Sequence, residues 1–437
     1  MNHILPAILA LLAMLATGLA SAADIPANPR TYRALLRQLQ PGDTLLLAPG
    51  DYADGLPVHR LVGTAAAPIR IRAANASARP RFVSRSDRNT VSIVDAMHVA
   101  ISDLDLDGDN LYVDAVKAEG NSRFAHHITL ENLRITGHGP HQQNVGISTK
   151  CPAAGWIVRG NEIIGGGTGM YFGNSDGNAP FVGGLIEDNL VVDTIGYNVQ
   201  IKHQNPRPGD VGLPTGDSVT IIRHNVFSKA RNSATGELAR PNVLVGHAPL
   251  SGPGQLDRVI VHGNLFHQNP TEALFQGEGH LVLYNNVFVN RDGSAIHIQP
   301  HHATPGEVAI FGNTVLAAGN GIRILGGGPE QRRRVWSNVV FAEITIQGGE
   351  ASGNVIGRLT DAASALRQAD GAVETLDLRL RRPPTGMPME TTSLPDADRD
   401  FCGTRRTDHT PGAFAQESPV PRLAIRRKGE GCGAPGR

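Results

Sequence analysis

A short repeated pattern constrains the fold of this chain more than any other feature. Each copy is a short apolar strand, then an asparagine, then two or three mostly apolar residues, between about residues 125 and 355. The repeated asparagines are Asn132, Asn161, Asn189, Asn225, Asn264, Asn286, Asn313 and Asn338. They are 29, 28, 36, 39, 22, 27 and 25 residues apart, so the local pattern persists while the spacing varies. This combination is typical of a solenoid whose coils tolerate loops at their corners.

The chemistry of asparagine supports the same interpretation. Asparagine tolerates left-handed backbone geometry, and its amide offers both donors and acceptors at a turn. In stacked coils, one asparagine per coil can hydrogen-bond to the next and form an internal ladder. The segments between the asparagines are too short for helices and are rich in Val and Ile, which favours strands. We therefore predict an all-β solenoid that buries its apolar side chains between neighbouring coils.

A second strand can be aligned from coil to coil. Its copies begin near Asn144, Asn198, Asn242, Glu272, Ala295 and Gly321. Because side chains alternate along a strand, inward-pointing Val199 and Ile201 would leave Gln200 and Lys202 pointing outward. The same alignment places Gln276, His297, Gln299 and Arg323 on the outer face. A register slip of one residue would invert every one of these assignments.

The asparagine turns and the Gly321–Ile324 strand resemble the right-handed parallel β-helices of the pectate-lyase-like superfamily. The resemblance covers roughly residues 40–355, and two end segments share it: Asp43–Tyr52 resembles a first coil, and Asp400–Phe414 resembles a closing segment. That superfamily includes polysaccharide lyases, epimerases, glycosidases and non-catalytic proteins, so the resemblance implies a fold more than a function.

The expected organisation has three parts. Residues 1–22 read as a signal peptide, because the apolar Ile4–Ala20 is followed by the small-x-small pattern Ala20-Ser21-Ala22. Residues 23–360 form the right-handed parallel β-helix, with a short helix at Tyr32–Leu39 that caps its open end. Residues 361–437 lose the repeat and become a C-terminal wrap with a mobile tail.

Export, net charge and cysteine content limit where the protein works and which partners it can have. We expect a periplasmic or secreted monomer with no membrane span after signal cleavage. The 40 acidic and 40 basic residues balance, so nothing indicates nucleic acid as a partner. Of the three cysteines, Cys402 and Cys432 could form a disulfide in an oxidising compartment and leave Cys151 free.

The longest repeat intervals mark the candidate site. They accommodate loops near residues 203–217, 229–240 and 248–256, and long loops on a rigid scaffold commonly build binding clefts. The aligned outer strand beside them carries the candidate substrate-binding residues Gln200, His203, Asn242, Gln276, Glu278, His297, Gln299, His301 and Arg323, with His302 close by. An outward polar row is also ordinary on a solvated β-helix.

These residues suggest β-elimination on a uronate polysaccharide, in which a base removes the C5 proton and a cation stabilises the enolate. Lys202 is the candidate base, with His247 stacked near it. A Lys–Arg pair one coil apart resembles the alginate- and chondroitin-cleaving lyases, which makes Arg223 a candidate contact for the substrate carboxylate. The alignment, however, puts Arg223 on a different strand. The resemblance also implies a carboxylate calcium cluster, but Gln200 stands where an acidic ligand would be expected, so the metal stays unknown and Ca²⁺ an open alternative.

One acidic run invites a calcium interpretation of its own. Asp103–Asp109 matches much of an EF-hand loop. Yet Leu104 and Leu106 alternate with the aspartates as in a half-buried strand, and we expect a strand followed by a turn.

The sequence thus predicts an exported polysaccharide lyase acting on an acidic polysaccharide. Two alternatives remain: a uronate C5 epimerase, which begins with the same proton removal, and a non-catalytic carbohydrate-binding or surface β-helix. A glycoside hydrolase would need paired carboxylates, and the aligned outer face shows no clear pair.

Overall fold

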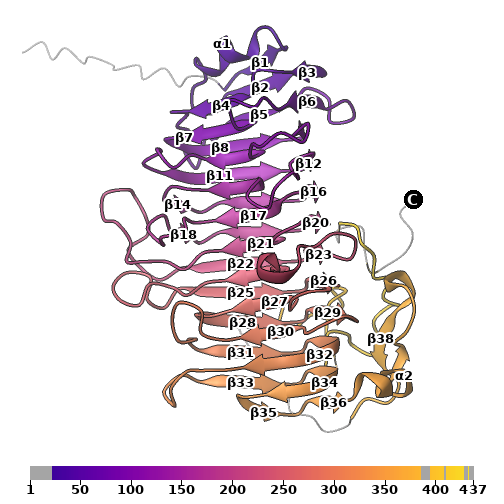
Figure 1. The fold of residues 1–437 in the computed structure, drawn as a ribbon. Coiled ribbons are helices and arrows are strands. Elements are labelled where there is room, and N and C mark those ends of the chain that lie inside the picture. Colours follow the sequence, from indigo (N-terminus) through magenta and orange to yellow (C-terminus); the bar gives the residue numbers. More distant parts are fainter. Residues whose placement is uncertain (1–21, 385–393, 408–409, 428–431, 433–437) are drawn as a thin grey trace, which may run out of the picture.

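A computed structural model describes residues 22–384, 394–407, 410–427 and 432. The chain winds into the predicted right-handed parallel β-helix, with strands in every coil stacked on those of the next (Figure 1). The signal peptide predicted at residues 1–22 lies outside the described residues except for Ala22, as do parts of the predicted C-terminal tail. No helix in the described part is long and apolar enough to cross a membrane.

Each coil contributes strands to three faces. The first face is one parallel sheet whose strands follow one another coil by coil: β1 (Asp24–Ala27), β2 (Thr44–Leu47), β5 (Ile69–Ala73), β8 (Ala96–Ser102), β11 (Ala125–Glu131), β15 (Ile157–Arg159), β19 (Leu185–Glu187), β22 (Val219–Arg223), β25 (Arg258–His262), β28 (His280–Tyr284), β31 (Val308–Phe311), β33 (Arg333–Trp336) and β35 (Glu350–Ser352). The short strands β14 (Ala153–Ala154) and β18 (Phe181–Val182) pair beside it.

The second face follows the asparagine turn. It contains β3 (Gly50–Tyr52), β6 (Pro80–Val83), β9 (Asp105–Asp107), β12 (Arg134–Thr136), β16 (Glu162–Ile164), β20 (Leu190–Val192), β23 (Val226–Ser228), β26 (Leu265–His267), β29 (Val287–Asn290), the first parts of β32 (Thr314–Ile324) and β34 (Val339–Gln347), and β36 (Val355–Gly357).

The third face carries the aligned strand of the sequence analysis. It contains β4 (Leu56–His59), β7 (Val91–Val94), β10 (Val116–Ala118), β13 (Val145–Thr149), β17 (Thr168–Phe172), β21 (Val199–Ile201), β24 (Val243–Val245), β27 (Phe275–Gly277), β30 (Ile296–Ile298) and the later part of β32. Side chains from all three faces meet in one continuous core.

The asparagine ladder is present and runs from Asn161 to Asn354. Each amide nitrogen donates to the amide oxygen of the next ladder asparagine, at 2.9–3.0 Å. The same oxygen also accepts the backbone N–H of the previous asparagine, as Asn264 does from Asn225 at 2.9 Å. The ladder satisfies polar groups that the coils bury completely, which a parallel stack requires.

Two details of the predicted ladder were wrong. The left-handed residue of each turn precedes the ladder asparagine, as at Asp188 (φ 56°) before Asn189. Asn132 occupies that preceding position (φ 53°), so Leu133 stands where the ladder residue would be, and its backbone N–H donates to Asn161 at 2.9 Å. The ladder therefore begins one coil later than the sequence pattern indicated.

The N-terminal end is closed as predicted by a helix that begins at Tyr32. This helix, α1 (Tyr32–Leu36), is shorter than the predicted segment, although Leu39 is also buried. The Tyr32 ring packs edge-on against Tyr52 and Phe82, so the first coils do not expose their apolar interior.

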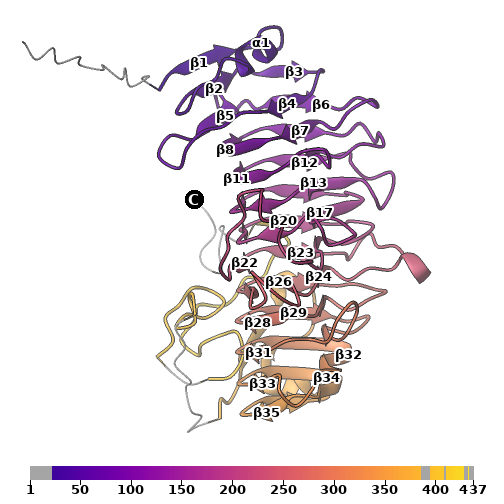
Figure 2. The same ribbon diagram turned by 90° about the vertical axis from the view of Figure 1, so that its left-hand side faces the viewer.

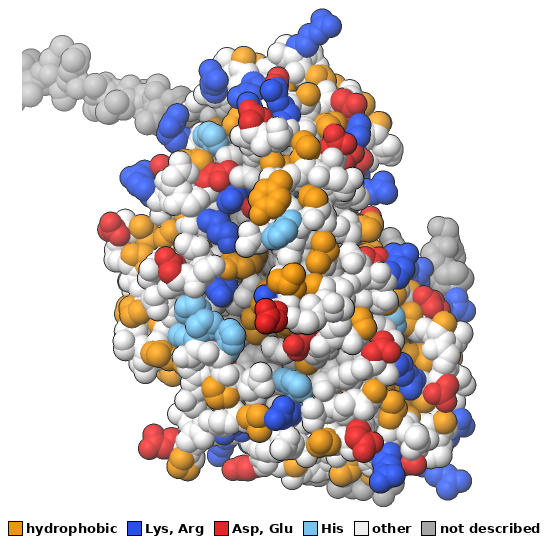
Figure 3. Space-filling model, in the orientation of Figure 1, with side chains coloured by type: hydrophobic (Ala, Val, Ile, Leu, Met, Phe, Trp, Pro, Cys, Tyr) orange, Lys and Arg blue, Asp and Glu red, His pale blue; other side chains and the backbone are white. Residues whose placement is uncertain are grey.

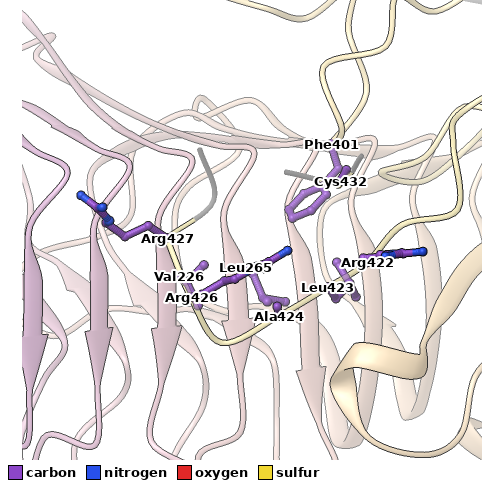
Figure 4. A pocket seen from close by; sticks show the side chains of 9 residues that line it. All are labelled: Val226, Leu265, Phe401, Arg422, Leu423, Ala424, Arg426, Arg427 and Cys432. Atoms are coloured by element: carbon purple, nitrogen blue, oxygen red, sulfur yellow. The ribbon is translucent and has the colours of Figure 1, made fainter. Parts of the chain in front are cut away.

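From β20 onward the second face is apolar on both sides, because the C-terminal segment covers its outer surface there (Figures 1 and 2). That segment contains η2 (Leu359–Asp361), α2 (Ala362–Ala365), the antiparallel pair β37 (Leu366–Gln368) and β38 (Asp377–Leu380), and η3 (Val373–Thr375). It also contains the expected Cys402–Cys432 disulfide, and Cys151 is free and buried. Figure 4 shows its final part, where Leu423 and Ala424 lie beside Val226 and Leu265 around a pocket of about 20 Å³, too small for a sugar.

The Asp103–Asp109 run forms the predicted strand and turn. Leu104 and Leu106 are fully buried, and the outward Asp105 and Asp107 lie near Arg79 and Arg81 at 3.6 and 2.6 Å.

The ladder generates a stability prediction. Asn264→Ala should lower the free energy of unfolding by about 3 kcal/mol, because it leaves buried donors and acceptors of two adjacent coils without partners. The measurement is the chemical denaturation midpoint. Ser337→Gly is the control, since Ser337 is the left-handed residue before a ladder asparagine (φ 53°) and glycine keeps that turn; it should cost less than about 1 kcal/mol. Equal losses in the two variants would contradict a special role for the ladder.

Candidate functional site

The third face presents two outward rows of side chains, in the predicted register. One row includes Gln200, and the other includes Lys202, two residues further along the chain. Gln200 pairs with Leu244, Leu244 with Gln276, Gln276 with His297, and His297 with Arg323 in successive strands. The first row continues toward the N-terminus through Tyr171, Ser148 and Lys117. The alternate positions, including Val199 and Ile201, are buried in the core, so the alignment was not slipped by one residue; the copy at Asn144 is displaced by two, since Ile147 and not Val145 is level with Val199.

A cleft of about 500 Å³ opens over the N-terminal half of this face. Its lining residues come from the third-face strands and the turns before them: Asn89, Tyr112, Val113, Asp114, Lys117, Gln142, Gln143, Asn144, Val145, Lys150, Thr168, Tyr171, Ser175, Tyr197, Gln200, Lys202 and Arg240. Figure 3 shows this side of the molecule, with basic and histidine side chains gathered around its middle. The cleft lies on the predicted strand, but its centre is closer to the N-terminus than the sequence analysis placed it.

One wall of the cleft is the long loop between β23 and β24, which contains η1 (Gly236–Leu238). Gln142, from an earlier coil, donates to the carbonyl of Leu238 at 2.7 Å and ties two turns together. The carbonyl of Arg240 accepts from the buried Lys229 ammonium at 2.7 Å and from Asn269 at 2.9 Å. Burial lowers the pKa of Lys229 to about 7, against an opposing effect of Glu272. These contacts fix the loop that brings Arg240 to the cleft.

Lysine is rare in this chain and concentrated at the cleft. The sequence has only five lysines, against 35 arginines, and Lys117, Lys150 and Lys202 line the cleft while Lys229 lies below its wall. Lysine, unlike arginine, can lose its proton near neutral pH when it is buried. Three of the five lysines thus line one cleft, where burial can change the charge of an amine.

Lys150 is the most perturbed of the cleft lysines. Burial lowers its pKa to about 8; Asp114 opposes this shift, whereas the charges of Lys117 and Lys202 add to it. Its ammonium nitrogen lies 3.3 Å from the centre of the Tyr171 ring. Lys150 is thus a partly neutral amine held over the floor of the cleft.

Asp114 organises the other side of Lys150. Its carboxylate accepts the backbone N–H of Val145 at 2.9 Å and the hydroxyl of Ser148 at 3.2 Å, and it lies 3.5 Å from the Lys117 ammonium. Only 9% of its side chain is exposed. These contacts hold the carboxylate in place beneath the cleft lysines.

Two tyrosines complete the floor. Tyr171 shares a hydrogen bond with Ser175 at 2.9 Å, and Tyr197 lies beneath the Arg240 guanidinium, 5.9 Å from it. Burial raises the pKa of both phenols, so both stay protonated at neutral pH and can donate a proton.

Lys202 lies at the junction between this cleft and a histidine cluster. Burial lowers the pKa of Lys202, and Glu278 opposes the shift. The His203 ring stacks on His302 with 3.9 Å between centroids and lies 5.4 Å from His247. Burial, with the charges of His302, Lys202 and His247, lowers the pKa of His203 to about 4, so this ring is neutral at neutral pH.

Glu278 supports this cluster from below and is almost fully buried. One of its oxygens accepts the backbone N–H groups of residues 301, 302 and 303 at 2.8–3.0 Å. These hydrogen bonds outweigh burial and lower its pKa. Glu278 therefore fixes the loop that carries His301 and His302, and its carboxylate is committed to that loop.

The remaining predicted residues separate into three groups. Gln276, His297, Gln299 and Arg323 lie on the same face, farther toward the C-terminus, where Gln276 donates to Glu272 at 2.7 Å. Asn242 is completely buried and accepts from Asn269 at 2.9 Å, so it braces a turn and cannot reach substrate. Arg223 lies on β22 of the first face, where it pairs with Glu187 at 2.7 Å and does not share the cleft.

Sequence reasoning missed Lys150, Lys117, Asp114, Tyr171 and Tyr197. The sequence analysis looked for outward side chains in the aligned strand copies and beside the longest loops, and none of these five residues lies in an aligned copy or in one of those loops. The rarity of lysine was visible in the sequence and would have selected Lys117 and Lys150.

A calcium ion does not fit the cleft. Calcium takes six to eight oxygen ligands and usually several carboxylates. Among the described residues that line the cleft, Asp114 is the one carboxylate, and it is already bound to Val145 and Ser148. The residues of this cleft therefore do not supply the ligands that calcium needs.

Known structures share this arrangement of stacked coils, at low sequence identity. A single-residue mutant of the PL6-family alginate lyase AlyGC matches with a TM-score of 0.53 and 14% identity, over 95% of this chain and 59% of that one. The GH136 lacto-N-biosidase from Eubacterium ramulus matches with a TM-score of 0.52 and 13% identity, over 77% and 68%. The catalytic unit of a GH87 α-1,3-glucanase from Streptomyces thermodiastaticus matches with a TM-score of 0.52 and 11% identity, over 77% and 69%.

These proteins share the fold of this chain. Their names describe different reactions, so the similarity supports the fold of this chain and does not identify its reaction. No family model matches the sequence, and no curated protein is similar enough in sequence to match it.

The charges around Lys150 predict how its titration responds to substitution. Asp114→Asn should lower the pKa of Lys150 below about 8, because it removes a carboxylate that favours the ammonium form; Lys202→Met should raise it, because it removes a repelling cation. The pH dependence of Lys150 acylation, followed by mass spectrometry, measures both shifts. A midpoint near the ordinary 10.5 in the unsubstituted protein would refute the burial of this amine.

Proposed function

We propose that this protein is a polysaccharide lyase that cleaves an acidic, uronate-containing polysaccharide by β-elimination. The observation that carries the proposal is the concentration of three of the five lysines in one cleft, with the pKa of Lys150 lowered to about 8. A lyase needs both a neutral base and nearby cations, and lysine can supply either one according to its surroundings.

The reaction assigns a role to each group. The neutral amine of Lys150 takes the proton from C5 of the uronate, and the electron pair left behind forms the C4–C5 double bond as the C4–O bond breaks. Tyr171, kept protonated by its raised pKa, gives a proton to the departing oxygen. Lys117, Lys202 and Arg240 offset the negative charge that spreads onto the carboxylate during proton removal. Lys202, the base candidate of the sequence analysis, thus acts mainly through its charge.

The cleft also supports an acidic substrate. Four basic side chains and one carboxylate line it, although the whole chain has equal numbers of acidic and basic residues. Such a local excess of one charge attracts a polymer of the opposite charge.

We also propose that the protein works outside the cytoplasm, in the periplasm or secreted. The signal-peptide pattern of residues 1–22 supports this, and so does the Cys402–Cys432 disulfide, because disulfides form and persist mainly in oxidising compartments.

The test of the reaction is ultraviolet absorbance of the unsaturated uronate on a panel of polymers: alginate, pectate, glucuronan, chondroitin and heparan. The proposal predicts a rise with at least one of them, whether or not calcium is added. Silence across the panel would reject the lyase; proton exchange at C5 detected by NMR would then indicate an epimerase, and binding without either reaction a carbohydrate-binding protein.

Substitutions separate the roles of the two lysines. Lys150→Arg should lower kcat by at least about 100-fold, because arginine keeps the charge but cannot act as a base near neutral pH. Lys202→Arg should keep substantial activity, whereas Lys202→Ala should lower kcat by about 100-fold, because one of the stabilising cations is lost, and should leave thermal unfolding nearly unchanged. Arg405→Met, which removes an exposed cation from the C-terminal segment, is the control for loss of one positive charge. The reverse pattern for the two arginine variants would make Lys202 the base.

A further inference from the structure

A group of metal-ligating side chains lies on the first face, away from the cleft. His224 follows β22, His262 ends β25 in the next coil, and Asp396 belongs to the C-terminal segment. One ligand atom from each lies within 4.8 Å of the other two. The three residues are 38 and 134 positions apart, so only the fold brings them together.

The surroundings orient these groups. The buried His262 ring stacks on Tyr284 with planes 2° apart and 4.8 Å between centroids, and it meets the His224 ring edge-on at 5.4 Å. The Nδ1 atom of His224 lies 3.9 Å from the Asp188 carboxylate. A carboxylate at this distance adds negative charge beside a histidine that would hold a cation.

Local charge is compatible with a cation. Arg223 contacts Asp396 at 3.4 Å and Glu187 at 2.7 Å, and Arg159 contacts Glu187 from the other side. Acidic and basic side chains alternate here, and Arg427 lines the same surface as Asp188 and Arg159. The carboxylate of Asp396 is held by Arg223 in the described structure, so a bound cation would take over part of that pairing.

The same place is where the C-terminal segment docks on the β-helix. Tyr284 donates its hydroxyl proton to the carbonyl of Pro395, Asn285 donates to the carbonyl of Arg399 at 2.6 Å, and Leu394 and Ala397 pack on the outer surface of the first face. A metal held by His224, His262 and Asp396 would cross-link this segment to two adjacent coils.

We propose that His224, His262 and Asp396 form a binding site for a divalent transition-metal ion of the zinc class, which staples the C-terminal segment to the β-helix. Two imidazole nitrogens and one carboxylate oxygen suit zinc, whereas calcium and magnesium prefer sets made of oxygen. Tetrahedral zinc with bonds of about 2.0–2.2 Å places its ligands about 3.3–3.5 Å apart. The ligand atoms, which lie up to 4.8 Å apart, would therefore have to draw closer when the ion binds, and the partly exposed Asp396 and His224 side chains are the ones with room to turn; water would be the fourth ligand.

The experiment uses the full-length protein, stripped with a chelator and dialysed against Zn²⁺. The proposal predicts one zinc ion per chain, counted by elemental mass spectrometry. It also predicts that the melting temperature rises with Zn²⁺ but not with Ca²⁺. Asp396→Asn and His224→Ala should each weaken zinc binding at least tenfold in calorimetric titration and abolish the thermal shift. Both change partly exposed side chains, so both variants should remain folded.

The matched control is His127→Ala. His127 stacks on His98 at 4.4 Å between centroids and forms another histidine pair on the same face. The control should keep one zinc per chain. The proposal fails if the protein binds no zinc, if His127→Ala loses it, or if Asp396→Asn and His224→Ala bind it as tightly as the unsubstituted protein.

Discussion

The structure depends on the satisfaction of buried polar groups at a turn that repeats in every coil. A parallel stack buries the backbone of each corner between two others, and water cannot reach it. From Asn161 to Asn354 the asparagine ladder provides the missing partners, since each amide bonds to the next coil and to the backbone beside it. The ladder fixes the register of neighbouring coils at one corner, and this sets the register of the strands on the other faces. Loops between those strands can therefore vary in length without shifting the stacked coils.

The fold could be predicted from the sequence because the fixed corner and its strands repeat, while the variation is confined to the loops. Ladder asparagines, alternating Val and Ile, and the register of Gln200, His297 and Arg323 all follow from repeated local rules, and the structure confirmed them. The misplaced Asn132 shows the limit of these rules. Asparagine suits two adjacent positions of the same turn, one for its backbone and one for its side chain, and a single copy of the pattern does not distinguish them.

The site was harder to predict because it depends on contacts between side chains of neighbouring coils that are far apart in the sequence. Lys150, Asp114 and Tyr171 come from three different coils with no shared motif, and the stacking of these coils buries the amine and lowers its pKa. Conversely, Asn242 and Glu278 looked accessible in sequence, but each is committed to holding a loop. The covered second face was also hidden, since a strand such as Leu190–Val192 is apolar on both sides only because a distant segment lies against it.

The third face also implies how such a cleft could change over evolutionary time. Every coil adds one row of outward side chains, about 4.8 Å from the last, and contacts only its two neighbours. Duplication or loss of a single coil would therefore lengthen or shorten the binding surface by one step without repacking the rest of the core. Selection for longer or shorter polymer segments can then act on the number of coils, while the chemistry of each row is tuned separately.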